Sequence, residues 1–303
     1  MIKALRNEMV SHGDRGAIVP ISRYDDLKRE MEALKTGEYH AWSDLMAEKM
    51  VLPNELGFKP RSLISVITPS PKVMLQFNYR GKPIQCVVPP IYSDEDSKDI
   101  KVLKYINEFL KPRGFMAAVA NNLPKKLLAV HCGLGLYGRN NIFFNEEYGS
   151  YTRLLSYVSD VPCDEADWFP IRCMEKCEQC RACVAACPTN AIDSTRRIID
   201  ASKCLTAINE SAGVFPDWVD KDAHNCLIGC MKCQDVCPGN AHNKNNIAKG
   251  VAFTGEETAE LLGHKRDEPY SDLLAAKIDA TGIASNFLRV LPRNLSVLLQ
   301  NIH

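Results

Sequence analysis

Cysteines at regular intervals are the residues of this chain whose type and spacing most directly indicate chemistry. A first run, followed by Pro188, contains Cys177, Cys180, Cys183 and Cys187, and a second run, followed by Pro238, contains Cys230, Cys233 and Cys237. Thiolate sulfur is a preferred ligand of iron, and C-x2-C-x2-C-x3-C-P is the spacing with which one loop presents ligands to a [4Fe–4S] cube. We therefore predict two iron–sulfur clusters, with a structural zinc site or buried free thiols as simpler alternatives.

The two runs are expected to share their ligands crosswise. In two-cluster ferredoxins the fourth cysteine of a run ligates the other cluster. Cluster one would then take Cys177, Cys180, Cys183 and Cys237, and cluster two would take Cys187, Cys230, Cys233 and one further cysteine. Two residues compete for that last place. Cys226 lies four residues before Cys230, which is one more than the usual step, and Cys204 lies in the middle of the insertion, so spacing alone does not choose between them.

Composition places the chain among ordinary globular proteins. Of its 303 residues, 46% are hydrophobic and 24% are charged, which suffices for a sizeable core in about two domains. Lys+Arg and Asp+Glu both number 37, so no net charge attracts the protein to nucleic acid or to an acidic membrane. No stretch approaches about 18 apolar residues, and residues 1–16 lack the apolar part of a signal peptide. We expect a cytoplasmic protein with reduced thiols and no membrane partner.

Helical and extended patterns alternate before the cysteine runs. We expect helices over residues 3–11 and 22–34, the second opened by a capping box between Ser22 and Asp25. Short β-branched runs at 62–67, 73–78 and 84–88 predict strands, and Val102, Ile106 and Leu110 recur at helical spacing. This alternation predicts an α/β domain over about the first 160 residues.

A glycine-rich loop at residues 133–141 contains a formal GxGxxG pattern. A dinucleotide-binding loop would follow a strand and open a helix, but here a predicted helix at 123–130 precedes the loop and an extended run at 141–145 follows it. Dinucleotide binding is therefore not favoured. Three close glycines would let the backbone approach a flat or bulky group, with Arg139 and Asn140 as polar contacts. The alternative is a tight structural turn.

Taken in order, these motifs resemble the epoxyqueuosine reductase family, which is itself similar to the corrinoid reductive dehalogenases. The resemblance covers roughly residues 60 to 300 and is specific as an ordered set. Its residues are Gly133, Gly135, Gly138, Arg139, Asn140, Asn145, Gly149, Ser150, Asp160, the Cys177 run, Cys204, the Cys230 run with Gln234, and the C-terminal Phe253, Thr254, Asn286, Val290 and Leu291.

The resemblance implies an α+β or α/β protein with three parts. Residues 1–165 would form a nitroreductase-like domain that holds base-off cobalamin, residues 166–250 a ferredoxin-like domain with two [4Fe–4S] clusters, and residues 251–303 a helical segment that packs on both. The family pattern favours Cys204 as the last ligand of cluster two. The corrin would lie beside the glycine loop, against Gly133, Gly135, Tyr137, Gly138, Arg139 and Asn140. A ferredoxin or flavodoxin would supply the electrons.

Departures from the family pattern shape the expected substrate. The family's proton-donating acid is missing, because the corresponding segment is Ala118–Asn122, and Tyr137 is the candidate replacement. The chain stops at His303, where longer members continue into helical repeats associated with tRNA, and its charge is balanced. We therefore expect a cobalamin-dependent reductase with a different, small-molecule substrate, and tRNA as an unlikely partner. The competing hypothesis is an electron-transfer protein that serves a partner, such as a corrinoid protein, without chemistry of its own.

Overall fold

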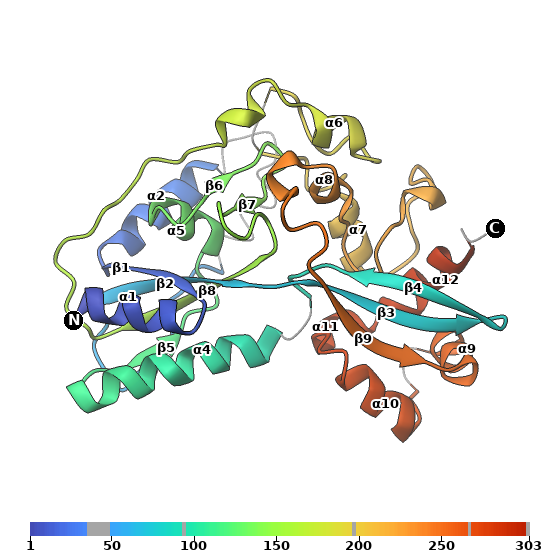
Figure 1. Cartoon of the computed structure of the whole chain (residues 1–303), viewed down its shortest axis with the longest axis horizontal. Coiled ribbons are helices and arrows are strands. Elements are labelled where there is room, and N and C mark those ends of the chain that lie inside the picture. The colour runs from blue at the N-terminus through green and yellow to red at the C-terminus, as the bar shows by residue number, and fades with distance from the viewer. Residues whose placement is uncertain (35–48, 93–94, 196–197, 266–267, 301–303) are drawn as a thin grey trace. The chain divides into compact units, whose positions relative to one another are not determined.

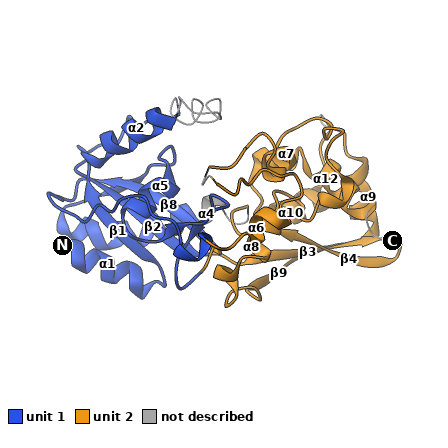
Figure 2. Ribbon diagram, turned by 90° about the horizontal axis from the view of Figure 1, so that it is seen from above, with its two compact units in different colours: residues 1–69, 97–148, 152–178 blue, residues 70–96, 149–151, 179–303 orange. Residues whose placement is uncertain are grey.

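The computed structural model of the chain describes residues 1–34, 49–92, 95–195, 198–265 and 268–300. It divides into two compact units (Figure 2): the first unit comprises residues 1–69, 97–148 and 152–178, and the second comprises 70–96, 149–151 and 179–303. The two units are defined by contacts between residues. The domains expected at 1–165, 166–250 and 251–303 were instead defined by sequence motifs, and they stay a prediction. Among the described helices, none has both the length and the apolar character needed to cross a membrane.

The first unit is built on a four-stranded antiparallel sheet in the order β1-β2-β8-β5. Its strands are β1 (Arg15–Pro20), β2 (Ser62–Pro69), β5 (Ala117–Val119) and β8 (Thr152–Ser159). Residues 62–67 of β2 are all buried, which confirms the strand predicted there and places it in the middle of the sheet. A strand buried on both faces needs covering elements on both sides.

Helices cover both faces of this sheet (Figure 1). Helices α1 (Ile2–Ser11) and α4 (Glu95–Leu110) pack on one face, where Leu5 and Ile106 are fully buried. Helices α2 (Arg23–Ala33) and α5 (Lys125–His131) pack on the other, where Leu27 and Leu128 are fully buried. The predicted helices at 3–11 and 22–34 are thus confirmed.

The capping box expected at the start of α2 is wrong. The Ser22 side chain makes no capping hydrogen bond, and its backbone is already helical at φ −57° and ψ −23°. An N-cap residue needs extended backbone for its side chain to reach the first free N–H groups. The first turn is held instead by the ion pair between Arg23 and Asp26, whose closest atoms are 2.7 Å apart.

The second unit contains a three-stranded sheet in the order β4-β3-β9. Strands β3 (Lys72–Tyr79) and β4 (Lys82–Val88) form an antiparallel hairpin, which confirms both predicted strands. Arg80 and Gly81 make the turn with φ of 52° and 77°, the left-handed geometry of tight hairpin turns. Strand β9 (Ile247–Phe253) lies parallel to β3, far from it in sequence.

Helices after β9 pack against this sheet and contribute to the second unit's core. They are α9 (Gly255–Gly263), α10 (Asp272–Asp279), α11 (Ser285–Leu288) and α12 (Leu291–Gln300). Leu261, Leu274 and Leu295 join Phe77 of β3 in one buried cluster. Phe77 and Phe253 stack across the sheet with ring centroids 4.7 Å apart.

Neutralising Glu257 is expected to lower the free energy of unfolding by about 2 kcal/mol at pH 7, because its bonds involve a charged group. Its buried carboxylate accepts from the backbone N–H of Thr254 at 2.7 Å, completing a capping box, and from Nζ of Lys277 at 2.6 Å. Glu257→Gln removes the charge, and Glu256→Gln on the same turn is the exposed control. Urea unfolding of both variants tests this, and equal stability of the two would contradict it.

The effect of Glu257 should depend on pH. Burial alone raises the pKa of this carboxyl, but the hydrogen bonds from Lys277 and Thr254 outweigh burial and leave the pKa below its usual range. A carboxyl with a lowered pKa stabilises the fold above the pKa of the unfolded chain, about 4.3, and loses that contribution as pH falls through the folded value. The difference between wild type and Glu257→Gln should therefore shrink below about pH 4.

Candidate iron–sulfur centres and glycine loop

The predicted cluster ligands lie on short helices and turns. Helix α6 (Ala182–Ala186) carries Cys183 and ends at Cys187, and helix α8 (Lys232–Asp235) carries Cys233. These two helices pack against each other within the second unit, which brings the segment of Cys183 and Cys187 next to that of Cys233. The predicted ligands form no disulfide and are of intermediate exposure: Cys177, Cys180, Cys183, Cys187, Cys204, Cys230, Cys233 and Cys237. Cysteine thiolates are the usual ligands of such clusters.

Burial, hydrogen bonds and neighbouring charges act on the pKa values of two predicted ligands of cluster two. Burial raises the pKa of Cys204, hydrogen bonds at the start of α7 (Leu205–Glu210) lower it, and the charge of Cys187 raises it again. Burial also raises the pKa of Cys230, a hydrogen bond from Asn225 lowers it, and the charges of Cys204 and Cys187 raise it. Cys187 thus acts on the pKa values of both Cys204 and Cys230.

Cys226, the competing residue, is already engaged in other contacts. Its side chain is 1% exposed, and its thiol donates to Oδ1 of Asn225 at 3.2 Å. The same oxygen accepts from the backbone N–H of Met231 at 2.9 Å, which directs Nδ2 of Asn225 to Sγ of Cys230 at 3.2 Å. Asn225 therefore fits as a donor to a ligand sulfur of cluster two. These contacts favour Cys204 over Cys226, although the ligand sets stay a prediction.

The Gly149-Ser150 motif supports the second cysteine run. Asn240, fully buried, accepts from the backbone N–H of Ser150 and donates to Ser150 Oγ and to the carbonyl of Gln234, each at 2.8 Å. Ser150 Oγ donates in turn to Oε1 of Gln234 at 2.7 Å. Asn240 also donates its own N–H to the carbonyl of Cys237 at 3.0 Å. Sequence reasoning singled out Gly149, Ser150 and Gln234 but missed Asn240.

The zinc alternative gains no support from the cysteine geometry. Among the residues that the structure describes, no three His, Cys, Asp or Glu side chains converge to hold a single metal ion. A tetrahedral zinc ion needs thiolates at about 2.3 Å from one point. A cube of iron and sulfide holds its thiolates further apart, because each binds a different iron.

The loop glycines are packed closely by aromatic rings. A Cβ would lie 2.6 Å from the ring of Phe169 at Gly133, 2.4 Å from the ring of Phe143 at Gly135, and 2.7 Å from the ring of Phe144 at Gly138. Gly133 also has a φ of 72°. Internal packing thus explains why these positions carry no side chain. The prediction that they contact a corrin is untested, and the packing gives it no support on the side where Cβ atoms would point.

The side chain of Tyr137 is buried in the first unit. Its side chain is 8% exposed and packs with Val130 and Phe143. Its backbone N–H donates to the carbonyl of Arg172, and its carbonyl accepts from the N–H of Met174, both at 2.9 Å. The loop is therefore tied to the segment that leads into the first cysteine run. The role of Tyr137 as a proton donor stays a prediction.

Arg139 and Asn140 contact the protein's own backbone. The Arg139 guanidinium donates to the carbonyl of Cys177 from Nε at 3.1 Å and from a terminal nitrogen at 2.7 Å. Asn140 is 3% exposed, and its Oδ1 accepts from the N–H of Ile142 at 3.3 Å. Arg139 thus holds the first cysteine of the run, which sequence reasoning did not anticipate. Their predicted contact with a corrin is untested.

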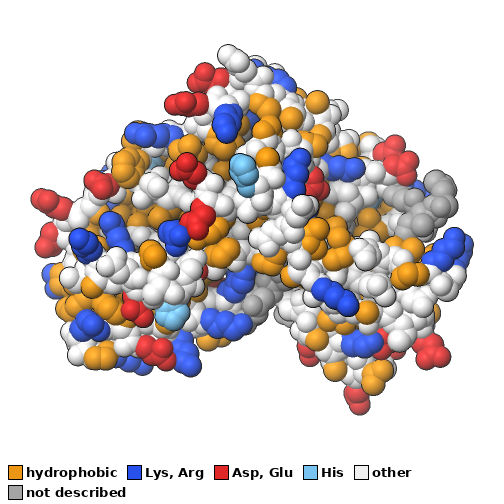
Figure 3. Space-filling view, in the orientation of Figure 1, with side chains coloured by type: hydrophobic (Ala, Val, Ile, Leu, Met, Phe, Trp, Pro, Cys, Tyr) orange, Lys and Arg blue, Asp and Glu red, His pale blue; other side chains and the backbone are white. Residues whose placement is uncertain are grey.

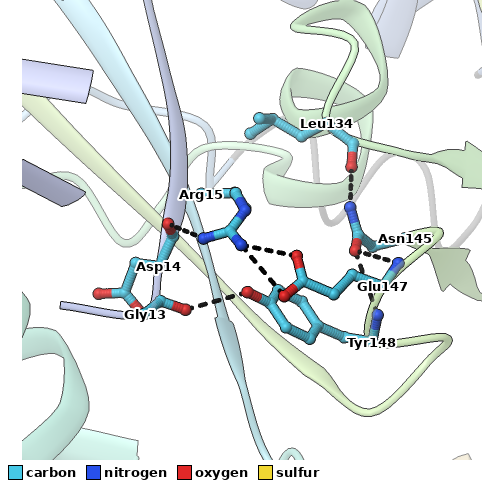
Figure 4. Close-up of polar contacts among 7 residues, drawn as sticks. All are labelled: Gly13, Asp14, Arg15, Leu134, Asn145, Glu147 and Tyr148. Carbon is cyan, nitrogen blue, oxygen red and sulfur yellow. Dashed lines mark hydrogen bonds and ion pairs between the residues drawn. The ribbon is translucent and has the colours of Figure 1, made fainter. Parts of the chain in front are cut away.

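Asn145, another residue of the family pattern, holds the glycine loop through the backbone of Leu134 (Figure 4). Its Nδ2 donates to the carbonyl of Leu134 at 2.8 Å, and its Oδ1 accepts from the N–H groups of Glu147 and Tyr148. Glu147 pairs with Arg15 at 2.8 Å, which joins this turn to strand β1. The short strands β6 (Leu136–Tyr137) and β7 (Phe143–Phe144) close the loop between these contacts.

Adding a methyl group at Gly135 is expected to cost about 2 kcal/mol, within the usual range for overpacking. The new Cβ would lie 2.4 Å from both the Phe143 ring and the carbonyl oxygen of Phe144, and backbone cannot move aside as a flexible side chain can. Gly263→Ala is the matched control, because nothing lies within 4 Å of its Cβ position. Thermal unfolding of both variants would refute the packing account if Gly135→Ala were as stable as the control.

The segment expected to hold the family's acid offers amides instead. Strand β5 ends at Val119, and the exposed Asn121 and Asn122 follow it. Oδ1 of Asn121 accepts from Nζ of Lys125 at 3.0 Å. An amide does not act as a proton donor at neutral pH.

Charged side chains of both signs are interspersed on the face shown in Figure 3, in keeping with the equal counts of 37. That face carries no extended field of one sign.

Comparison with known proteins agrees with these observations. A family model described as "4Fe-4S double cluster binding domain" matches residues 176–240. The epoxyqueuosine reductase of Leadbetterella byssophila is 38% identical over 149 residues, which are 46% of this chain and 47% of that protein. The enzyme of the same name from Cyclobacterium marinum is 29% identical over 234 residues, 68% of each chain. The chain thus spans less than half of the first of these relatives.

Solved structures show the fold. An epoxyqueuosine reductase from Bacillus subtilis, described with its catalytic aspartate loop swung out of the active site, matches with a TM-score of 0.71 at 20% identity, over 99% of this chain and 82% of that one. An epoxyqueuosine reductase solved with an epoxyqueuosine-modified tRNA stem loop matches with a TM-score of 0.66 at 20% identity, with the same coverage. This chain therefore has the fold of those proteins.

Proposed function

Because the chain belongs to the epoxyqueuosine reductase family, we propose that it is a cobalamin-dependent iron–sulfur reductase that acts on epoxyqueuosine in tRNA. The observation that carries the proposal is the match of residues 176–240 to a double-cluster domain, in a region where α6 packs against α8. We propose with it the nitroreductase-like and ferredoxin-like parts and the cluster ligands expected from the sequence.

The residues of this chain would hold the clusters that pass electrons and would adjust the reduction potentials of those clusters. Removing an epoxide oxygen as water takes up two electrons and two protons, and iron–sulfur clusters pass electrons singly. Asn225 would donate to a ligand sulfur of cluster two, and hydrogen bonds to sulfur adjust a cluster's potential. Arg139 would hold Cys177 of cluster one through its carbonyl. Cobalamin, when bound, would supply the reactive metal for the difficult step. Family membership supports it, and the packed glycine loop does not.

The prediction that tRNA is an unlikely partner is wrong. It rested on balanced charge and on the position of the C-terminus, and it is overturned by the solved epoxyqueuosine reductase that carries a tRNA stem loop and shares the fold of this chain. Net charge averages over the whole surface, whereas nucleic acid contacts one face, so a neutral protein can bind it. The expected small-molecule substrate likewise has no support in these relatives, all named for epoxyqueuosine.

Anaerobic reconstitution tests the proposal. The protein should take up about eight irons, as two cubes require, and should bind cobalamin with a changed absorption spectrum. With dithionite, the loaded protein should convert the epoxyqueuosine of a tRNA stem loop, and omission of cobalamin should abolish turnover. Full clusters without any corrinoid binding would instead support the electron-transfer hypothesis. Full clusters and bound cobalamin without turnover would reject the substrate.

Replacing Tyr137 by phenylalanine tests the proposed proton donor. The change removes only the hydroxyl, so the packing of the ring with Val130 and Phe143 should persist. If the hydroxyl supplies a proton, turnover should fall by about 100-fold, the lower range for general acid catalysis. Tyr148→Phe is the matched control, because its hydroxyl donates to the Gly13 carbonyl at 3.0 Å. Equal turnover of the two variants would assign Tyr137 to packing.

A further inference from the structure

The C-terminal helix α12 reaches the segment that carries the predicted ligands of cluster two. Its Arg293 donates to the carbonyl of Gly213 at 2.7 Å and to the carbonyls of Ile208 and Asn209, each at 3.2 Å. The guanidinium also lies over the ring of Phe215, 4.0 Å from its centroid. One side chain of α12 thus holds the end of α7 and the loop that follows it.

Asn294, the next residue, connects this helix end to the second cysteine run. It is fully buried, and its Nδ2 donates to the carbonyl of Asn209 at 3.0 Å and to that of Leu227 at 2.9 Å. Its Oδ1 accepts two hydrogen bonds from Arg293, at 2.9 and 3.1 Å. The Asn209 side chain adds a bond to the carbonyl of Gly229 at 2.7 Å. These contacts join the end of α7 to the residues just before Cys230.

The position of α7 depends on these contacts. The helix has six residues and begins directly after Cys204, which is its N-cap. A helix this short is not stable alone in water. Its last carbonyls have no partner within the helix, and a cation and an amide from α12 satisfy them. Because a helix is rigid over six residues, holding its far end also holds Cys204.

We propose that Arg293 and Asn294 are positioning residues for cluster two, which keep Cys204 at the correct distance from Cys230. The inference rests on the ligand set of the proposed function. It assigns to the C-terminal helix a role in cluster assembly, although α12 contains no cysteine and follows the cysteine runs by more than fifty residues. Neither residue ligates iron. Arg293 binds backbone carbonyls of the segment that follows Cys204, and Asn294 binds one carbonyl of that segment and one of the segment before Cys230.

Arg293→Leu and Asn294→Asp test this role. Asn294→Asp keeps the shape but can no longer donate to the carbonyls of Asn209 and Leu227. Gln300→Ala is the control on the same helix, because Gln300 is exposed and bonds only to Ser296 among the contacts described. Iron per chain after anaerobic reconstitution, the paramagnetic resonance spectrum of the reduced protein and the thermal unfolding of the iron-free protein are measured for each.

The expected result is a selective loss. Wild type and Gln300→Ala should hold about eight irons with the spectrum of two interacting clusters, whereas Arg293→Leu and Asn294→Asp should hold about four irons with the spectrum of one isolated cluster. Arg293→Lys, which keeps the charge without the planar group of donors, should hold an intermediate amount. A full complement of iron in Arg293→Leu and Asn294→Asp would overturn the proposal.

Two further outcomes separate this inference from other failures. If both clusters were lost together, in proportion to a lower unfolding temperature of the iron-free protein, the residues would serve only general stability and the proposal would fail. If wild type itself took up fewer than two clusters, its iron content alone would reject the ligand set and the proposed function, independently of the variants.

Discussion

Replacing Cys204 by alanine should halve the iron content, from about eight irons to about four, while replacing Cys226 by alanine should leave it unchanged. The two residues are a matched pair, because sequence spacing admits both as the last ligand of cluster two. A cube that has lost one of four thiolates is exposed to solvent and is readily degraded. The proposed reductase activity should fall below detection in Cys204→Ala, since electrons would have to pass a missing cluster.

The structure gives the reason for the difference. Cys204 stands at the start of α7, where its pKa, raised first by burial, also responds to the charge of Cys187. Cys226 is 1% exposed and donates to Asn225, so its removal costs a small cavity, about 1 kcal/mol, rather than a ligand. Reconstitution under anaerobic conditions, iron analysis and paramagnetic resonance measure the outcome. Loss of iron in Cys226→Ala with retention in Cys204→Ala would exchange their roles.

Local patterns in the sequence were sufficient for several elements and for the cysteine runs. Strand β2 and the β3–β4 hairpin follow from β-branched runs and a turn at Arg80-Gly81, and the ligand loops follow from spacing within a few residues. The parallel pairing of β9 with β3 joins residues 72–77 to residues 247–253, and no local pattern encodes it. The second unit therefore includes the hairpin that the sequence assigned to the first domain.

The glycine loop shows that a motif typical of ligand binding can have a packing role. Its three glycines suggested a surface for a flat ligand, yet Phe143, Phe144 and Phe169 occupy the space where their side chains would lie. Phe169, which packs on Gly133, follows it by 36 residues (169 − 133), so this packing could not be read from spacing. Arg139, expected to contact a cofactor, holds the carbonyl of Cys177 instead.

The residues that sequence reasoning missed make contacts that no sequence spacing marks. Asn240, Arg293 and Asn294 donate to backbone carbonyls on segments that carry or adjoin cysteines, and Asn225 donates to the sulfur of Cys230. The Gly149-Ser150 pair did indicate such a contact, because a motif residue far in sequence from both cysteine runs is expected to bind a residue near one of them. The structure supplies that partner in Asn240.

Replacing Asn240 by alanine should lower the free energy of unfolding of the iron-free protein by about 4 kcal/mol. The side chain, fully buried, makes three hydrogen bonds of 2.8 Å, one accepted from Ser150 and one donated to each of Ser150 and Gln234. Each buried polar group left without a partner costs roughly 1–3 kcal/mol, and alanine leaves the Ser150 N–H and the Gln234 carbonyl unpaired. Part of this loss in free energy of unfolding comes from the cavity that the smaller alanine side chain leaves.

Cluster binding should fall together with stability in this variant, because Asn240 also donates its N–H to the carbonyl of Cys237 and sets the turn after that residue. Asn240→Asp should have an intermediate effect, since it keeps the acceptor for the Ser150 N–H but loses both donated bonds. Asn245→Ala, at an exposed position nearby, is the control. The unfolding temperature of Asn240→Ala should drop on the order of 10 °C. A drop no larger than that of the control would show that Ser150 and Gln234 find other partners and that the motif supports the cysteine run by another route.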